Sequence, residues 1–378
     1  MTAALRRIAV AAVAAGLAAP HAFAEELGPG FFDVEQRRAE LQQPDYAEAR
    51  DACLAVATED ALPLPAPLAG LYPTDDYGTD NSSEDYAWAM MVLGGRSLAG
   101  DAEATGILVE GLIAWAEADA LEDTPTHYDP FFALKRTMLP TMVAYRIVAD
   151  QMTAEDSALV RDWIDGLVRR VDVEFDAEVD RNNHRYLTDL ALMAWGSIAR
   201  DQALLDKGLG RYAIALGQAR PDGSLPLETR RGARAMWYTN VSLGELTSMA
   251  EIAGASGAAL YPTAVDGGMT HATMLGFLLD VLETPGRILP YAAENVVPGP
   301  TDDYRSQDLG FTVTRGHGRH YMAWTEALLA TAPDSAPARR MADYFTAELA
   351  DLRPLIDEYA GGNATCFWMQ PPAARPSQ

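Results

Sequence analysis

The sequence predicts an all-α protein built from antiparallel helical hairpins, as in an α/α barrel or toroid. Two observations support this fold class. Apolar residues recur at three-to-four spacing in most of the chain, which is the pattern of helices with one buried face. Short Asp/Gly/Pro/Thr breaks such as TPTHYDP, RPDGS and ETPGR separate these segments, as expected for antiparallel neighbours. Convincing strands are few, and the best short candidate is LGFTVTRG at 309–316.

Each helical segment is expected from its own periodicity. Side-chain oxygens at Thr153 and Asp201 can cap the free amides where two of the helices begin. Nothing in the middle of the chain resembles a linker, so we expect residues 25–378 to form a single domain. The proline-rich stretch and polar loop within 60–80 form either an arm or lid, or a plain surface connection. The expected helices cover 84–100, 103–120, 133–152, 154–175, 185–201, 202–220, 231–255, 266–285 and 338–352.

The first 24 residues have the pattern of a secretory signal peptide. Arg6 and Arg7 precede an apolar run rich in Ala and Val, and the letters AFA at 22–24 have the form of a cleavage site. A first membrane helix is the alternative, but the run is short and is interrupted by Gly and Pro. We therefore expect residues 1–24 to be removed and the remaining protein to be exported to the periplasm.

The composition restricts the partners of this protein. Acidic residues number 54 against 29 basic ones, so the net charge is -25 at pH 7. Such a surface argues against nucleic acid, whose binding needs a basic footprint, and against anionic membranes. No later stretch is long and apolar enough to span a bilayer. We expect a monomer that binds neither nucleic acid nor membrane.

The cysteines and histidines say little about metal binding. Cys53 and Cys366 lie near the two ends of the chain, with no CxxC motif, and there are 6 histidines. In an oxidising compartment the two cysteines can form a disulfide, while two free buried thiols are the alternative. A zinc site has little support, and we expect no metal.

The stretch DRNNHRYL at 180–187 places polar side chains where a helix begins. Pure capping is one interpretation, because Asn182 or Asn183 can bond the first free amides. The other interpretation is chemical. A carboxamide can hydrogen-bond a carboxylate, while a neutral imidazole such as that of His184 can accept a proton near neutral pH.

The stretch LETRRGARAMWYTN at 227–240 gathers arginines within a strongly acidic chain. A helix is expected to begin near Arg231, so that Arg231, Arg234 and Tyr238 lie at i, i+3 and i+7 on one face. The planar fork of arginine matches a carboxylate, and nearby positive charge favours the phenolate form of a tyrosine. A solvated arginine-rich face paired with acids is the alternative.

Taken together, the two stretches resemble a known family. The text NNHRYL, then DGSLPLE, then RRGARAMWYTN is similar to the alginate lyases of polysaccharide lyase family 5 and their glucuronan-lyase relatives. That family shows Asn-Asn-His-Ser-Tyr-Trp, then Asp-Gly-x-Leu-Pro-x-Glu, then Arg-Gly-x-Arg-Ala-Leu, with Tyr seven positions after the first arginine. The resemblance covers most of 60–345, although only these blocks match closely. It implies an incomplete (α/α) toroid with a substrate groove, an exported enzyme and no organic cofactor.

The resemblance also implies roles for single residues. Asn183 and Arg231 would hold and neutralise the carboxylate of a uronate, and His184 would assist them or act as base. Tyr238 would protonate the leaving oxygen and, in some substrates, would also remove the C5 proton. A polyanionic substrate needs a positive groove, which Arg231 and Arg234 are expected to face. The further candidates for substrate contact are Arg234, Arg185, Lys135, Arg136 and Tyr77, although Lys135 and Arg136 also fit plain helix-surface charges.

The sequence departs from the family around these residues. Thr239 follows the tyrosine where His is common, and Arg185 and Leu187 replace Ser and Trp. Asp76 stands where alginate-specific members carry Lys before the lid tyrosine. These changes leave the reaction type intact and put mannuronate specificity in doubt. His317 and His320 are interpreted as loop residues, and His127 has no assigned role.

The sequence thus predicts a periplasmic polysaccharide lyase that cleaves a polyuronate, alginate or polymannuronate first, by β-elimination. The nearest alternative is a lyase for glucuronan or another glucuronate polymer. An α/α-barrel glycoside hydrolase would need two opposed carboxylates, and none stands in a recognisable motif. A non-catalytic polysaccharide-binding protein is the alternative from another class.

Overall fold

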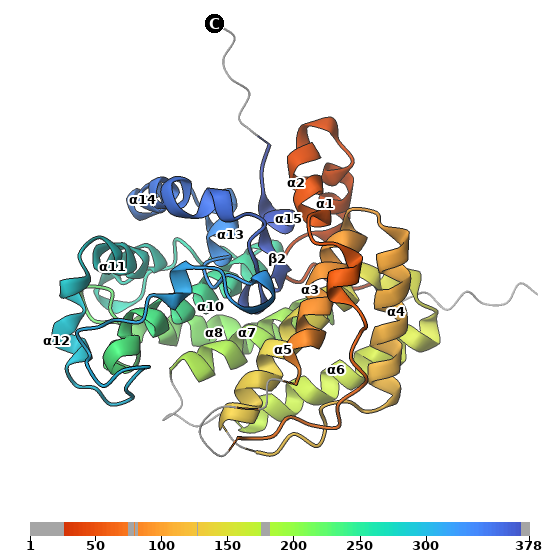
Figure 1. The fold of residues 1–378 in the computed structure, drawn as a ribbon, viewed down its shortest axis with the longest axis horizontal. Coiled ribbons are helices and arrows are strands. Elements are labelled where there is room, and N and C mark those ends of the chain that lie inside the picture. Colours follow the sequence, from red (N-terminus) through yellow and green to blue (C-terminus); the bar gives the residue numbers. More distant parts are fainter. Residues whose placement is uncertain (1–25, 75–78, 80–81, 127, 175–181, 372–378) are drawn as a thin grey trace, which may run out of the picture.

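The described part of the chain folds into paired helices arranged in two layers (Figure 1). The computed structural model describes residues 26–371 apart from 75–78, 80–81, 127 and 175–181. The predicted signal peptide at 1–24, Tyr77 and His127 lie outside these residues.

The inner layer is a series of long, almost wholly buried helices. It consists of α3 (Glu84–Leu98), α5 (Tyr128–Val148), α7 (Asn183–Ile198) and α10 (Ala235–Ala255). In this series α3 contacts α5, α5 contacts α7, and α7 contacts α10. Helices that are apolar on nearly every side are stable only when they are enclosed. This layer therefore needs cover from outside.

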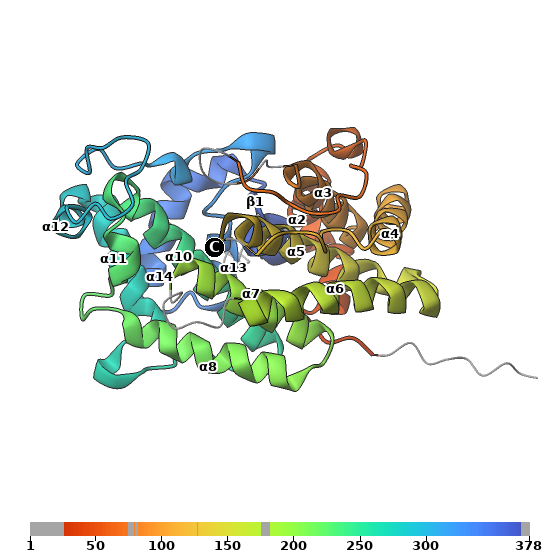
Figure 2. The same cartoon turned by 90° about the horizontal axis from the view of Figure 1, so that it is seen from below.

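The outer layer supplies that cover. Helix α4 (Ala102–Glu117) packs on α3, α6 (Ala154–Glu174) on α4 and α7, and α8 (Gln202–Gln218) on α7, as Figure 2 shows for α8. On the other side, α11 (His271–Glu283) contacts both α10 and α14 (Ala336–Tyr344). Inner and outer helices alternate along the chain from α3 to α8, which is the arrangement of an α/α toroid.

The C-terminal segment lies between the two ends of the inner series. Strand β2 (Gly362–Asn363) contacts α3, and the turn at 358–360 contacts both α5 and α10. Strand β2 pairs antiparallel with β1 (Ile356–Asp357). The helical ring is therefore open where this hairpin inserts, and the prediction of an all-α, incomplete toroid is confirmed.

Shorter helices complete the described chain. Cys53 of α2 and Cys366 of α15 form a disulfide with a Cα–Cα distance of 4.7 Å, which is one of the two interpretations that the sequence left open. None of the helices in the described ranges combines the length and apolar character that a bilayer span requires. The shorter helices are α1 (Val34–Leu41), α2 (Ala47–Leu54), α9 (Pro226–Thr229), α12 (Leu289–Ala292), α13 (Trp324–Thr331) and α15 (Ala364–Trp368).

The predicted strand at 309–316 is wrong. Residues Gly310–Thr312 form a 3₁₀ turn, and Arg315 makes only an isolated bridge with Arg319. The burial pattern is not that of a strand either, because Phe311 is buried and Val313 is exposed although residues two apart in a strand face the same side. A strand also needs a partner for its backbone groups, and the described residues offer this segment none beyond that bridge.

Part of the 60–80 segment is fixed on the outer layer. Trp115 of α4 donates its indole N–H to the carbonyl of Pro65 at 3.1 Å, and Leu71 N donates to Thr124 Oγ1 at 3.2 Å. Beyond this anchored stretch the chain reaches Thr79, which lines the candidate site described below. A lid role for this segment stays a prediction.

Candidate active site

The start of α7 separates a capping residue from a functional one. Asn182 is the N-cap, and its Oδ1 accepts the backbone N–H of His184 at 3.1 Å. The next side chain is therefore not needed for capping. Asn183 is buried, and its Oδ1 accepts a hydrogen bond from Nη2 of Arg231 at 3.3 Å. Its amide Nδ2 has no hydrogen-bond acceptor among the described residues.

Glu228 connects this asparagine to Arg231. It lies in α9, fully buried, and its Oε1 accepts the backbone N–H of Asn183 at 2.9 Å. Its Oε2 lies 3.7 Å from Nε of Arg231, which also donates to the carbonyl of Leu227 at 3.1 Å. Burial raises the pKa of Glu228, while the charge of Arg231 opposes that rise. The contacts with Glu228 and Leu227 orient the guanidinium of Arg231 toward Asn183.

A glycine kink sets the geometry between Arg231 and Tyr238. Gly232 has φ +56°, and a Cβ added there would lie 1.9 Å from Oδ1 of Asn295. The chain then forms a 3₁₀ turn at Gly232–Arg234 before α10 begins at Ala235. The predicted helix start at Arg231 is therefore wrong by one turn, because a left-handed residue cannot continue a right-handed helix. Even so, the guanidinium carbon of Arg231 lies 4.3 Å from the ring centroid of Tyr238.

These side chains meet in one cavity of about 360 Å³ between α5, α7 and α10. Aromatic rings, those of Phe132, Trp237, Tyr321 and Tyr359, form much of its lining. The polar side chains that line it are those of Thr79, Asp129, Arg136, Asn183, His184, Arg234 and Tyr238. Arg231 contacts both Asn183 and Tyr238, so it belongs to the same cluster.

His184 is held neutral in this cavity. Burial lowers its pKa well below 6.5, and the positive charges of Lys135 and Arg231 lower it further. Its ring packs on Phe132, with the ring centroids 4.7 Å apart. A neutral imidazole at neutral pH can accept a proton, as the sequence predicted.

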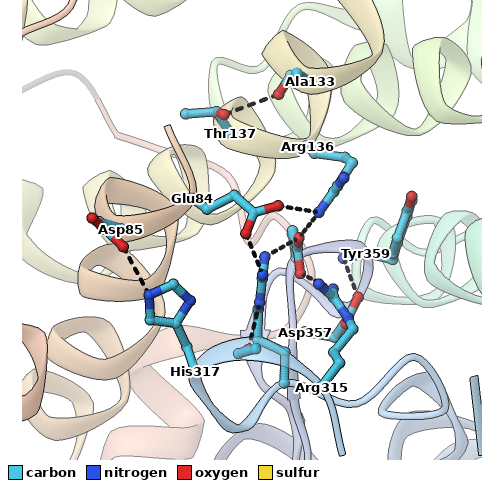
Figure 3. A network of polar contacts seen from close by, with 12 residues as sticks. Glu84, Asp85, Ala133, Arg136, Thr137, Arg315, His317, Asp357 and Tyr359 are labelled. Atoms are coloured by element: carbon cyan, nitrogen blue, oxygen red, sulfur yellow. Dashed lines mark hydrogen bonds and ion pairs between the residues drawn. The ribbon is translucent and has the colours of Figure 1, made fainter. Parts of the chain in front are cut away.

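Arg136 belongs to a second polar network that reaches the cavity wall (Figure 3). Its Nη2 bonds the buried carboxylate of Glu358 and lies 3.9 Å from Glu84. Glu358 also accepts from Arg315 at 2.5 Å and from Arg319 at 2.8 Å. Although burial alone would raise the pKa of Glu358, these arginines hold it well below its usual range. Arg136 is therefore a fixed charge and not a helix-surface residue.

The remaining candidates lie in different surroundings. Arg234 lines the cavity with a side chain that is 35% exposed and lies 3.8 Å from Asp308. Lys135 is fully buried behind the cavity, where it bonds the carbonyl of His184, and Arg185 is buried and does not line it. This burial removes both from direct contact with a polymer. Tyr77 lies outside the described residues.

The histidines of RGHGRH lie in the loop where the sequence placed them. His317 lies in a short turn, and its Nε2 is 2.7 Å from Oδ1 of Asp85. His320 is buried, and its backbone N–H donates to the carbonyl of Ile356. Among the residues that the structure describes, no three His, Cys, Asp or Glu side chains cluster in a way that would hold a metal ion.

The fold and the cavity define a helical toroid protein with a cationic, aromatic-lined cleft, and the comparisons agree. The alginate lyase family model matches residues 45–288. The chain belongs to the alginate lyase family, which confirms the resemblance of the NNH, DGSLPLE and RRGAR blocks.

Known relatives match part of the chain. A polysaccharide lyase of Stenotrophomonas maltophilia is 32% identical over 187 residues, which is 48% of this chain and 54% of that relative. An alginate lyase of Azotobacter vinelandii is 29% identical over 180 residues, 43% of this chain and 45% of the relative. The chain thus spans about half the length of the curated relatives it matches.

Solved structures share the fold over nearly the whole chain. Alginate lyase A1-III, solved as a His-to-Ala variant complexed with a tetrasaccharide, superposes with a TM-score of 0.74 at 22% identity, covering 93% of this chain and 99% of that one. An alginate lyase from Bacteroides ovatus gives a TM-score of 0.58 at 16% identity, covering 89% and 96%. At these identities the similarity shows the fold.

Proposed function

We propose that this protein is a polysaccharide lyase that cleaves alginate, with polymannuronate as its first substrate, by β-elimination. The observation that carries the proposal is the buried amide of Asn183, whose Nδ2 donor has no acceptor among the described residues and which lies beside the guanidinium of Arg231 on a cavity that also holds His184 and Tyr238. Family membership and the tetrasaccharide bound by A1-III support a uronate polymer as ligand.

The cluster supplies what the reaction needs. The C5 proton of a uronate is weakly acidic, and its removal places negative charge on the adjoining carboxylate. Arg231 and Asn183 would stabilise that charge. Hydrogen-bond donors that are already oriented in a buried site stabilise a developing negative charge more strongly than water does. The C5–H bond breaks, the C4=C5 double bond forms, the C4–O4 bond breaks, and a proton is delivered to O4.

The base and the acid depend on the sugar. In β-mannuronate and β-glucuronate the C5 hydrogen and O4 lie on the same side of the ring, so the phenol of Tyr238 would serve as base and then acid. In guluronate they lie on opposite faces. There the neutral imidazole of His184 would be the base and Tyr238 the acid.

A glucuronate polymer is the second candidate substrate. Thr239, Arg185 and Leu187 depart from the family pattern beside the catalytic positions, and Arg185 and Thr239 are buried there. Mannuronate and glucuronate differ only at C2, so the shared catalytic groups do not separate them. Measuring the activity on polymannuronate and on glucuronan side by side distinguishes the two substrates.

One assay tests the activity and distinguishes its alternatives. The purified protein is incubated with polymannuronate, polyguluronate and glucuronan, and the ultraviolet absorbance of the new conjugated double bond is followed. A hydrolase would release reducing ends without this absorbance, and a non-catalytic binding protein would give neither signal.

Tyr238→Phe should remove the acid and base while it keeps the ring that stacks on Arg231. We expect kcat to fall by about three orders of magnitude or more, since loss of a general acid–base group typically costs 10²–10⁴-fold and this group serves twice. Binding of the polymer, measured by calorimetry, should stay within about threefold of wild type. Wild-type turnover in this variant would refute the mechanism.

We also propose that the protein is exported to the periplasm. The leader pattern at 1–24 and the disulfide between Cys53 and Cys366 support this, because disulfides persist in oxidising compartments. A fusion of residues 1–30 to alkaline phosphatase should be active, and deletion of residues 2–24 should keep the protein in the cytoplasm. A fusion that stays inactive would contradict export.

A further inference from the structure

The start of α10 has no side-chain cap of its own, although this helix carries Tyr238. The first turn of a helix leaves backbone N–H groups without partners inside the helix. Arg234 occupies the N-cap position, and its side chain makes no capping hydrogen bond. The turn before it begins at Gly232, whose left-handed φ separates Arg231 from α10. The polar groups of this turn therefore depend on partners from elsewhere in the chain.

Gln307 supplies these partners. Its Oε1 accepts the backbone N–H of Met236, 71 positions earlier in the chain, at 3.1 Å, which caps the first turn of α10. Its Nε2 donates to the carbonyl of Gly232 at 2.9 Å and to that of Tyr304 at 2.6 Å. The three contacts agree on one orientation of the carboxamide, with the oxygen toward an N–H and the nitrogen toward two carbonyls. One side chain thus bridges the two ends of the kink.

The segment at 294–313, which carries this glutamine, is also held against the kink by its backbone. The N–H of Val296 donates to the carbonyl of Arg230 at 2.9 Å, and the N–H of Asp308 donates to that of Ala233 at 2.7 Å. These bonds use main-chain atoms, so they remain when the glutamine side chain is replaced. A substitution of the side chain therefore tests the carboxamide without removing the segment.

Arg231 is fixed independently of this bridge. Its Nε contacts Glu228 and the carbonyl of Leu227, and its Nη2 donates to Oδ1 of Asn183. Tyr238 lies on the other side of the kink, in the first turn of α10. Loss of the bridge should therefore leave Arg231 with Asn183 and release the turn that carries the phenol.

We infer that Gln307 is a positioning residue of the lyase, whose carboxamide ties the kink to the first turn of α10 and so holds the phenol of Tyr238 against Arg231. The ring centroid of Tyr238 lies 4.3 Å from the guanidinium carbon of Arg231. The inference rests on the proposed function for its catalytic meaning. Because displacement of a reacting group by about 1 Å can cost about a hundredfold in rate, a hydrogen bond outside the cavity can control kcat.

Two substitutions separate the cap of α10 from the tie to the kink. Gln307→Glu keeps an acceptor for the N–H of Met236, at a helix N-terminus where negative charge is favourable, but it has no donor for the two carbonyls. Gln307→Met keeps a similar length and removes all three hydrogen bonds. Gln370→Met is the matched control, because that carboxamide also joins two groups, the carbonyl of Trp368 at 3.1 Å and the hydroxyl of Tyr46 at 3.4 Å, and does not line the cavity.

Initial rates on polymannuronate test the catalytic part of the inference. In both Gln307 variants we expect kcat to fall about tenfold to hundredfold and KM to stay within about threefold, because Arg231 and Asn183 still bind the carboxylate. Gln370→Met should keep the wild-type kcat and KM. Thermal unfolding is measured alongside. Gln307→Glu should melt near the wild-type temperature because it keeps the cap, whereas Gln307→Met should melt at a lower temperature.

Hydrogen exchange tests the bridge without turnover. Mass spectrometry follows the exchange of the amides in a peptide that covers 232–238. Gln307→Met should speed this exchange about threefold to tenfold, as expected for the loss of one hydrogen bond. Gln307→Glu and Gln370→Met should exchange at nearly the wild-type rate, because the N–H of Met236 keeps its acceptor in both.

Two results would overturn the inference. Wild-type exchange in Gln307→Met would show that the carboxamide does not hold this turn. Wild-type kcat in Gln307→Glu would show that Gln307 is only a helix cap, and this result decides the question even when Gln307→Met fails to fold. Absence of lyase activity in the wild type would count against the proposed function, while faster exchange in Gln307→Met would still support the bridge.

Discussion

At the scale of single residues, the site depends on an acid that sequence reasoning passed over. Asn183, His184, Arg231 and Tyr238 were predicted from the two motifs, and the structure brings them to one cavity. Glu228 belongs to both the DGSLPLE and the LETRRGARAMWYTN stretches, but no role was predicted for it. It stands three positions before Arg231, a spacing at which opposite charges meet on a helix. That spacing was the available signal.

Glu228→Gln tests this connecting role. The amide oxygen can still accept the N–H of Asn183, but the negative charge beside Arg231 is lost. We expect kcat/KM to fall about tenfold to hundredfold, because hydrogen bonds to charged groups contribute roughly 1.5–3 kcal/mol.

Glu326→Gln is the matched control for this experiment, since it removes a buried acid that pairs with Arg353 and does not line the site. It should lower the melting temperature and leave kcat/KM within about twofold of wild type. Equal kinetics in the two variants would contradict a special role for Glu228.

At the scale of elements, periodicity predicts long helices well and short or irregular segments poorly. The segments assigned to α3 through α8 and to α10 repeat apolar residues over several turns, so their pattern is unambiguous. Helices such as α9, with 4 residues, and α15, with 5, are too short to show a period. The two-residue strands β1 and β2 depend on partners brought together by the fold, which no local pattern reveals.

The kink before α10 shows why the geometry of the site could not be predicted from the sequence alone. A helical repeat from Arg231 placed three side chains on one face, whereas Gly232 breaks the helix by its left-handed φ. The side chains still converge, because the 3₁₀ turn rotates Arg231 onto Asn183 and Tyr238. A Cβ at this position would meet Asn295 and Pro298, which come from a distant part of the chain and which no local pattern reveals.

Gly232→Ala should therefore damage the site more than the fold. The new Cβ would both strain the backbone and collide with Asn295, so we expect a loss of about 1–3 kcal/mol in the free energy of unfolding. The kcat/KM should fall by at least about tenfold as Arg231 moves away from Asn183.

Gly210→Ala provides the comparison, because that glycine lies within α8 and a Cβ there meets nothing within 4 Å. Alanine is the better helix former, so this variant should gain up to about 1 kcal/mol in stability and keep wild-type kinetics. Chemical denaturation and initial rates measure both effects. A Gly232→Ala enzyme with normal kcat/KM would show that the kink is not required.

At the scale of the whole molecule, an acidic protein places several arginines around the cavity where an anion would bind. The net charge of -25 belongs to the chain as a whole, whereas Arg136 and Arg234 line the cavity and Arg231 adjoins it. The buried acids Glu228 and Glu358 hold Arg231 and Arg136 in place. Composition argued against nucleic acid as a partner but could not reveal the local field, which depends on how the helices bring separate segments together.

The disulfide ties together segments that are 313 positions apart in the sequence. In the unfolded chain it would restrict a very long loop, so its removal should increase the entropy of the unfolded state. We expect the double variant Cys53→Ala/Cys366→Ala to lose about 2–5 kcal/mol in the free energy of unfolding. Its kcat/KM at 25 °C should stay near wild type, because neither cysteine lines the cavity.

Urea denaturation with and without dithiothreitol measures this contribution. The reductant should lower the free energy of unfolding of the wild type toward that of the double variant, and it should leave the double variant unchanged. This comparison separates the effect of losing the bond from the effect of losing the buried sulfur atoms. Alkylation of the denatured protein should label both cysteines only after reduction. Labelling before reduction would show free thiols in the native protein, and the C-terminal segment would then owe its place between α3 and α10 to packing alone.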